Sequence, residues 1–88
     1  MRERELEKQL KVLANRRRLA ILKYLKVRRE APVAEIAEEI NLSFKSTSKH
    51  LTILAAADVI EREQRGLQMF YRLTGDYKAA VRHIINLL

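Results

Sequence analysis

The sequence predicts a mainly α-helical domain in which a β-hairpin precedes the last helix. Its most informative segment is Ser43–Leu54, SFKSTSKHLTIL, which has helical periodicity, a capping serine, two lysines and no acidic residue. A shorter acidic helical pattern, PVAEIAEEINL, comes directly before it, and Asn41–Leu42 joins the two. Between residues 58 and 73 the periodicity changes to that of strands. Two helices with a tight turn, followed by a hairpin, indicate a winged helix-turn-helix of order ααααββα.

Length and composition limit the class of protein. The chain has 88 residues, of which 48% are hydrophobic and 33% charged, and this is typical of one folded domain over residues 1–88. Since there is no cysteine, disulfides and thiolate metal sites are excluded. No apolar run approaches the roughly 20 residues of a membrane span, and the start, MRERELEKQL, contains no apolar signal segment. We therefore expect a cytoplasmic protein with no membrane partner.

Two helices are expected at the start of the chain. Leucines at helical spacing predict an amphipathic helix over residues 3–13. Asn15 is a good N-cap for a second helix over about residues 16–27. The first turn of this second helix holds three arginines, Arg16, Arg17 and Arg18. Because the helix dipole disfavours cations there, we expect these side chains to meet an anion such as a DNA phosphate.

The helix-turn-helix pattern comes next. Val33 is predicted to form a short strand, and Ala34–Ile40 a short third helix whose glutamates face water. Asn41 suits the left-handed backbone conformation that often ends a helix. Ser43 caps the fourth helix, residues 43–57, although the matching acidic residue of a full capping box is absent.

A hairpin and a last helix complete the pattern. Strands are expected on both sides of Gly66, which supplies the turn. A hairpin with arginine near its tip fits a wing that touches the DNA backbone or minor groove. The residues of the hairpin predicted to contact DNA are Arg62, Arg65 and Gln68. Thr74–Gly75–Asp76 then start the last helix, Tyr77–Leu88.

The exposed side of the fourth helix carries most of the residues expected to contact DNA. One face should pack inward and consists of Thr47, Leu51 and Leu54. The predicted DNA contacts lie on the opposite face and its margins: Ser43, Phe44, Lys45, Ser46, Ser48, Lys49, His50 and Thr52. Lys45 and Lys49 are one turn apart and can reach phosphates or guanine. His50 is expected to contact a phosphate or to pack at the junction of helix and hairpin.

The net charge of +7 favours a polyanionic partner. Residues 1–30 contain eleven Lys/Arg against four Glu, whereas residues 31–88 contain seven of each sign. The first thirty residues therefore carry the whole excess, and the fourth helix is a local basic spot in a balanced half. We expect double-stranded DNA as the partner. The arginine cluster, the lysines of the fourth helix and the wing would together neutralise its phosphates.

Three motifs, in order, carry a family resemblance. LKVLANRRRLAILKYL includes Arg18, VAEIAEEINLSFKSTSKHLTILAAADVI includes a Ser-Lys-His-Leu step at 48–51, and REQRGLQMFYRL includes the hairpin glycine. Together they resemble the second helix, the helix-turn-helix and the wing of the ArsR-type (arsenic-repressor-like) winged helix-turn-helix regulators. The resemblance implies a dimeric transcriptional repressor that an effector releases from DNA. It does not identify an effector for this chain.

The metal site of that family is missing. The family's Cys-x-Cys pair entering the third helix falls on Pro32 and Ala34, neither of which can bind a metal. A second family site uses acidic and histidine ligands on the last helix, where this chain offers Asp76 and His83. An ordinary acid at a helix start and a lone surface histidine are the simpler interpretation. We therefore expect no metal and no cofactor.

Apolar residues on the first and last helices predict a two-fold dimer, because they exceed what a small monomer readily covers. The predicted interface residues are Leu6, Leu10, Leu13, Tyr77, Val81, Ile84, Ile85 and Leu88. The alternative is that both helices pack fully within one subunit.

These observations predict a sequence-specific DNA-binding regulator, a dimeric repressor that places residues 43–57 in the major groove of an inverted repeat. The rival interpretation is a winged-helix module that binds an acidic protein, without sequence-specific DNA binding. An enzyme is disfavoured. The chain has two histidines, no cysteine, no phosphate-binding glycine loop and no paired carboxylates in an apolar setting.

Overall fold

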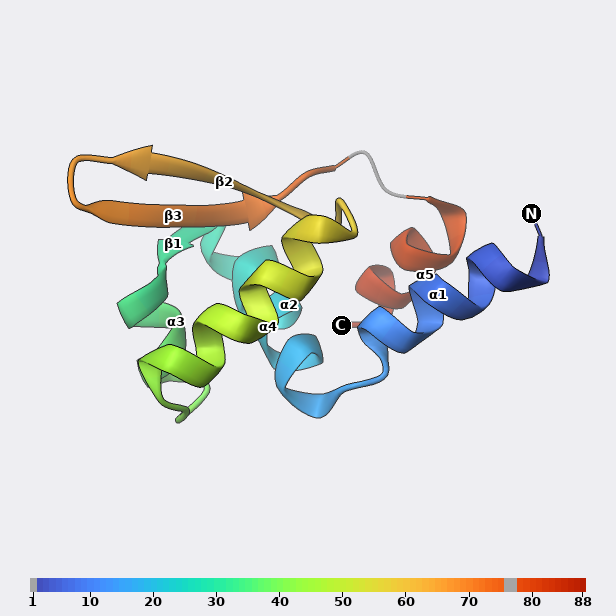
Figure 1. Cartoon of the computed structure of the whole chain (residues 1–88), viewed down its shortest axis with the longest axis horizontal. Helices are drawn as coiled ribbons and strands as arrows, with labels where there is room; N and C mark the ends of the chain where they lie inside the picture. Colours follow the sequence, from blue (N-terminus) through green and yellow to red (C-terminus); the bar gives the residue numbers. More distant parts are fainter. Residues whose placement is uncertain (1, 76–77) are drawn as a thin grey trace.

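The computed structural model describes residues 2–75 and 78–88 and has the winged helix-turn-helix fold (Figure 1). The elements, in order, are α1 (Glu3–Leu13), α2 (Arg16–Arg28), β1 (Glu30–Pro32), α3 (Val33–Glu39), α4 (Phe44–Ala56), β2 (Ile60–Arg65), β3 (Gln68–Leu73) and α5 (Ala79–Leu87). The domain measures 39 × 22 × 20 Å. The hairpin, α3 and α4 lie toward one end of its long axis, and α1 and α5 lie side by side at the other.

One strand was placed wrongly by the sequence prediction. The short strand is Glu30–Pro32, and Val33 is instead the first residue of α3. β1 pairs antiparallel with β3, with Ala31 opposite Tyr71, so the wing is a three-stranded sheet of order β1-β3-β2. β1 is an edge strand, which tolerates the missing N–H of its proline. Three residues are too short to show alternation, so the sequence pattern could not locate this strand.

Three predicted helix ends are confirmed by their hydrogen bonds and backbone angles, whereas the last helix begins at Ala79, with Lys78 as its N-cap, and not at the predicted Tyr77. The side chain of Asn15 accepts from the N–H groups of Arg17 and Arg18 at 2.9 and 3.1 Å. Ser43 accepts from the N–H of Ser46 at 3.1 Å and so caps α4. Asn41 ends the α3 segment with a φ of 56°, in the left-handed region. The two caps determine where α2 and α4 begin, and the left-handed Asn41 allows a tight turn between α3 and α4.

The core lies between α2, α3, α4 and the sheet. The side chains that are almost completely buried there are Ile21, Leu22, Leu25, Ile36, Thr47, Leu51, Leu54, Val59 and Ile60. The predicted inward face of α4 is therefore confirmed. Burying each large aliphatic side chain contributes about 1.5–3 kcal/mol, and this burial fixes α4 against the rest of the domain.

The terminal helices are only partly available as an interface. Three of the predicted interface residues, Leu13, Val81 and Ile85, are buried in the chain's own core. They form the inner edge of the apolar stripes, because α1 and α5 pack on the domain and on each other. The outer edge is exposed at Leu10 and also at Leu87, which the prediction omitted. The predicted residue Tyr77 lies outside the described residues.

Candidate nucleic-acid interface

The exposed face of α4 is a basic, hydroxyl-rich surface. Lys45, Lys49 and Thr52 are exposed on the side of α4 opposite its buried residues. A shallow depression runs along this side and is lined by Lys45, Ser46, Ser48, Lys49, His50, Thr52 and Ile53. Seven residues of one helix thus present a continuous surface to solvent, and six of them are polar.

The two lysines of this surface are unpaired. Within residues 2–75 and 78–88, neither Lys45 nor Lys49 makes an ion pair or a side-chain hydrogen bond. Thr52 donates its hydroxyl to the carbonyl of Ser48 at 2.9 Å, so this hydroxyl is partly used within the helix. Both ammonium groups are consequently available to an external anion.

The arginine cluster has other partners than the predicted phosphate. Arg17 Nη1 donates to the carbonyl oxygen of Ile40 at 2.6 Å, at the C-terminal end of α3. Arg18 donates from Nε to the carbonyl of Val12 and from Nη2 to that of Lys11 at 3.2 Å, at the end of α1. The carbonyl ends of these two helices carry partial negative charge, which accounts for cations at the start of α2. Only Arg16 is exposed and without such a bond among the described residues.

The ring of His50 contacts Arg18 of α2. Its Nδ1 is 3.2 Å from Arg18 Nη1. Since a guanidinium only donates, Nδ1 is the acceptor and the ring is neutral. Burial, followed by the charges of Arg18 and Arg17, lowers the pKa of His50 below its usual 6.5. His50 therefore buttresses α4 on α2.

Arg65, at the end of β2, is held by acidic neighbours. Its two Nη atoms donate to the two carboxylate oxygens of Glu30, each at 2.8 Å, and Nη2 also lies 3.1 Å from Glu63 Oε1. The guanidinium lies 4.6 Å from the centre of the Phe70 ring. These hydrogen bonds raise the pKa of Arg65 and lower that of Glu30. This contact could not be predicted from the sequence, because Glu30 and Arg65 are 35 residues apart.

The two faces of the wing differ in whether their arginines are paired with carboxylates. Arg72 is bound by Glu61 at 2.8 Å and Glu63 at 3.0 Å on the same face as Arg65, so that face is internally neutralised. Arg62 lies on the other face, with Ile60, because side chains alternate along a strand. Arg62 is exposed and makes no ion pair among the described residues. It is therefore the wing arginine best placed to meet an external anion.

The wing tip itself is uncharged. Gly66 has a φ of 62° and, with Leu67, joins the two strands in a two-residue turn. Leu67 is completely exposed, and Gln68 beside it is exposed as well. The exposed side chains at the tip are thus those of a leucine and a glutamine, and not the arginine that the sequence suggested.

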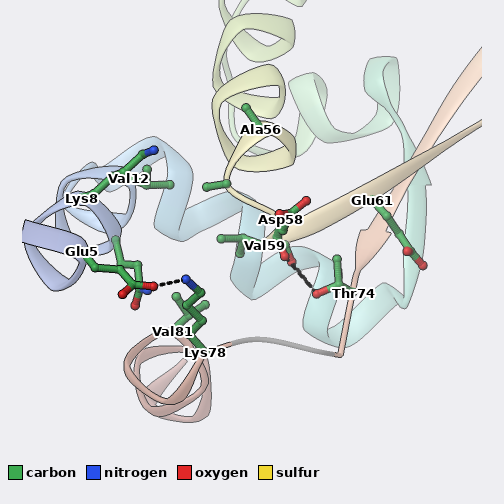
Figure 2. A pocket seen from close by; sticks show the side chains of 12 residues that line it. Glu5, Lys8, Val12, Ala56, Asp58, Val59, Glu61, Thr74, Lys78 and Val81 are labelled. Carbon is green, nitrogen blue, oxygen red and sulfur yellow. Dashed lines mark hydrogen bonds and ion pairs between the residues drawn. The ribbon is translucent and has the colours of Figure 1, made fainter. Parts of the chain in front are cut away.

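A second hollow lies away from this surface, between α1, the turn after α4 and α5 (Figure 2). Val12, Val59 and Val81 approach its middle from three elements, and the Glu5–Lys78 ion pair lies at its edge. In residues 2–75 and 78–88, no three His, Cys, Asp or Glu side chains group closely enough to hold a metal ion. Asp76, one of the two residues considered for a metal site, lies outside the described residues.

Comparison with known proteins agrees with this geometry. A family model described as a helix-turn-helix domain matches residues 13–63. HlyU from Vibrio cholerae, in its reduced form, is 31% identical, with a TM-score of 0.79 over 96% of this chain and 84% of HlyU. The transcriptional repressor PagR of Bacillus anthracis is 27% identical, with a TM-score of 0.74 over 98% of both chains. A search of curated protein sequences gave no match.

A third solved structure connects the fold to a named family. It is the homodimeric winged helix-turn-helix DNA-binding domain Mb0332 from Mycobacterium bovis, described as a possible ArsR-family regulator. It is 28% identical, with a TM-score of 0.77 over 94% of this chain and 73% of that one. Fold, helix-turn-helix and wing define a winged helix-turn-helix regulator. The chain belongs to the ArsR-type family of these regulators, and it has no cysteine for that family's cysteine metal site. In the described part of the chain, no helix is long and apolar enough to cross a membrane.

Proposed function

We propose that the protein is a sequence-specific transcriptional repressor that binds double-stranded DNA as a homodimer. The observation that carries the proposal is the exposed face of α4, whose lysines Lys45 and Lys49 are unpaired within the described chain. A helix with its inner face locked in the core and a basic outer face can enter the major groove, about 12 Å wide. Binding there would occlude a promoter, and no catalytic step is involved.

The dimer would leave this surface free. The terminal helices lie at the opposite end of the long axis from α3 and the wing tip (Figure 1). The partly or fully exposed apolar residues of α1, α5 and the chain end beside α5 include Leu6, Leu10, Ile84, Leu87 and Leu88. A two-fold axis through them pairs the same patch on both subunits and presents two copies of α4 to one face of DNA. The operator would then be an inverted repeat with half-sites about 34 Å apart.

Fewer basic side chains are available to contact phosphates than the sequence predicts. Lys45, Lys49, Arg16 and Arg62 are exposed without an ion-pair partner in the described chain, and we assign them the main phosphate contacts. Arg17, Arg18 and Arg65 make intramolecular bonds, so they contribute mainly by placing other elements. Binding should therefore be steeply salt-dependent but should not require every arginine.

The proposal is tested by random-site selection on duplex DNA, followed by binding of the selected duplex at several salt concentrations. Lys49→Ala should weaken binding and reduce the slope of log K against log [salt] by about 1 per subunit, because each lysine neutralises one phosphate. Lys23→Ala is the matched control, because Lys23 is an exposed lysine on α2, away from the α4 surface.

Two results would contradict the proposal. One is that no sequence is enriched and the salt slope with duplex is flat, as expected for a module that binds an acidic protein. The other is that Lys49→Ala and Lys23→Ala have equal effects, which would remove the α4 surface from the binding site.

A further inference from the structure

Among residues 2–75 and 78–88, Phe44 is the largest apolar side chain that is exposed at the surface. It is the first residue of α4, and 60% of it is accessible to solvent. The helix start does not depend on it, because Ser43 supplies the cap. It is also absent from the apolar side chains that pack on the core. A mostly exposed aromatic ring therefore stands at the N-terminal end of α4, where neither the helix cap nor the core cluster uses it.

The position of Phe44 at the start of α4 indicates which chemical group its ring can contact. The first residues of a recognition helix are the ones that contact base edges in the major groove. Each base pair presents hydrogen-bonding groups there, and the one methyl group in the major groove of unmodified DNA is the C5-methyl of thymine. A phenyl ring has no donor or acceptor for the major-groove edges of guanine, adenine or cytosine. Among the four bases, thymine offers it the largest apolar contact, through its methyl group.

The neighbours of Phe44 make this assignment more specific. Lys45 and Lys49 are suited to phosphate oxygens or to guanine O6 and N7, and the serines of the same surface to hydrogen bonding. Phe44 is the one aromatic residue of α4, and the exposed apolar residue Ile53 lies nine positions on, near the other end of the helix. The polar contacts and the apolar contact therefore fall at different positions along the groove.

We propose that Phe44 is a specificity-determining residue that packs on the methyl group of a thymine in each operator half-site. This inference rests on the proposed function, because it requires α4 in the major groove. It goes beyond that function because it names the base that Phe44 recognises, thymine, and the group that Phe44 contacts, the methyl group.

The test replaces each thymine of the selected operator by uracil, one symmetric pair at a time, which removes only the methyl group. At one position per half-site, wild-type protein should bind about fourfold more weakly per methyl lost, which corresponds to about 0.8 kcal/mol for one buried carbon group. With Phe44→Ala, the same replacement should have no effect, and Phe44→Leu should retain part of it. Val27→Ala, at an exposed apolar residue of α2 that is not part of the α4 surface, is the matched control and should respond to uracil as the wild type does.

The outcomes separate this inference from the proposed function. If the wild type selects no sequence, the proposed function fails and the inference fails with it. If an operator is selected but its uracil sensitivity is the same in wild type and Phe44→Ala, or no thymine is sensitive, the Phe44 assignment is wrong while the function stands. Because the side chain is exposed, Phe44→Ala should keep the wild-type melting temperature, and this shows that any change comes from the DNA contact.

Discussion

At the scale of single residues, the same charge can serve the fold or the ligand, and the partner decides which. The positions of Arg17 and Arg18 in a helix first turn suggested an external anion. The structure shows that both side chains donate to carbonyl oxygens at the ends of neighbouring helices. Lys45 and Lys49 have no such partner among the described residues. Net charge alone therefore overstates how many cations face DNA.

His50 should make the stability of the protein depend on pH between neutrality and mild acid. Burial and two nearby arginines lower its pKa in the folded state below the value near 6.5 expected in the unfolded chain. As the pH falls through 6.5, the unfolded chain therefore binds a proton that the folded chain does not yet bind. The free energy of unfolding should fall across this window, until the pH reaches the folded-state pKa.

Urea denaturation at a series of pH values measures this dependence. His50→Gln should flatten it, whereas His83→Gln, which removes the other histidine of the chain, should leave it in place. An unchanged slope in His50→Gln would show that another group titrates in this window. The lowered pKa values of Glu30 and Glu63 act separately, because their stabilisation is lost only as the pH falls below about 4.5.

At the scale of elements, the wing is a hairpin fastened to a third strand. Arg65 reaches from the end of β2 across Phe70 to Glu30 on β1. This bidentate contact uses the charge of Arg65 and restrains the hairpin at the same time. The glutamates of the wing and of β1 are thus the partners of Arg65 and Arg72, and Arg62 is left without an ion pair in the described chain.

Releasing Arg65 should strengthen DNA binding. Glu30→Gln removes the bidentate carboxylate and leaves Arg65 only its single contact with Glu63, so the guanidinium is freer to turn to a phosphate, and the salt slope should increase by up to about 0.9 per subunit. Glu39→Gln is the matched control, because it removes an equal charge from an exposed residue of α3 that has no ion pair in the described chain. Adding Arg65→Ala to Glu30→Gln should cancel the gain. An equal gain in the Glu39 variant would show that only net charge matters.

Local signals account for what the sequence could predict about these elements. The helices were foreseen because periodicity, the caps Asn15 and Ser43 and the left-handed Asn41 are all read within a few residues. β1 was misplaced because its only signal is pairing with β3, about 40 residues later. For the same reason, the α4 surface was predictable from spacing, whereas the Glu30–Arg65 contact was not.

At the scale of the whole molecule, the two ends of the domain have different surfaces. The α4 surface and the wing tip are polar or basic, apart from Phe44, Ile53 and Leu67, whereas the terminal helices expose Leu10 and Leu87. Periodicity could identify the apolar stripes but could not tell which edge the chain's own core covers. The core takes up Leu13, Val81 and Ile85, and the outer edge is left for a partner.

Leu87→Glu should weaken the proposed dimer without unfolding the subunit. Leu87 is 71% exposed, so the subunit loses little packing, whereas a dimer would lose about 1.5–3 kcal/mol for each buried leucine. Sedimentation equilibrium should show at least tenfold weaker association. Val27→Glu, at a residue of α2 that is 76% exposed, is the control and should remain dimeric. Equal dissociation of both variants, or of neither, would place the interface elsewhere.

The hydrogen bond from Arg17 to the carbonyl of Ile40 has a consequence for how such a protein can diversify. The turn that aims α4 is held by a residue 23 positions earlier, in a helix that makes no part of the helix-turn-helix. The residues that orient α4 are therefore different from the residues of α4 that would contact DNA. Substitutions at the outward positions of α4 can change which DNA is recognised while the scaffold that orients the helix is inherited intact. New operators can thus be acquired stepwise, without an intermediate that has lost its fold.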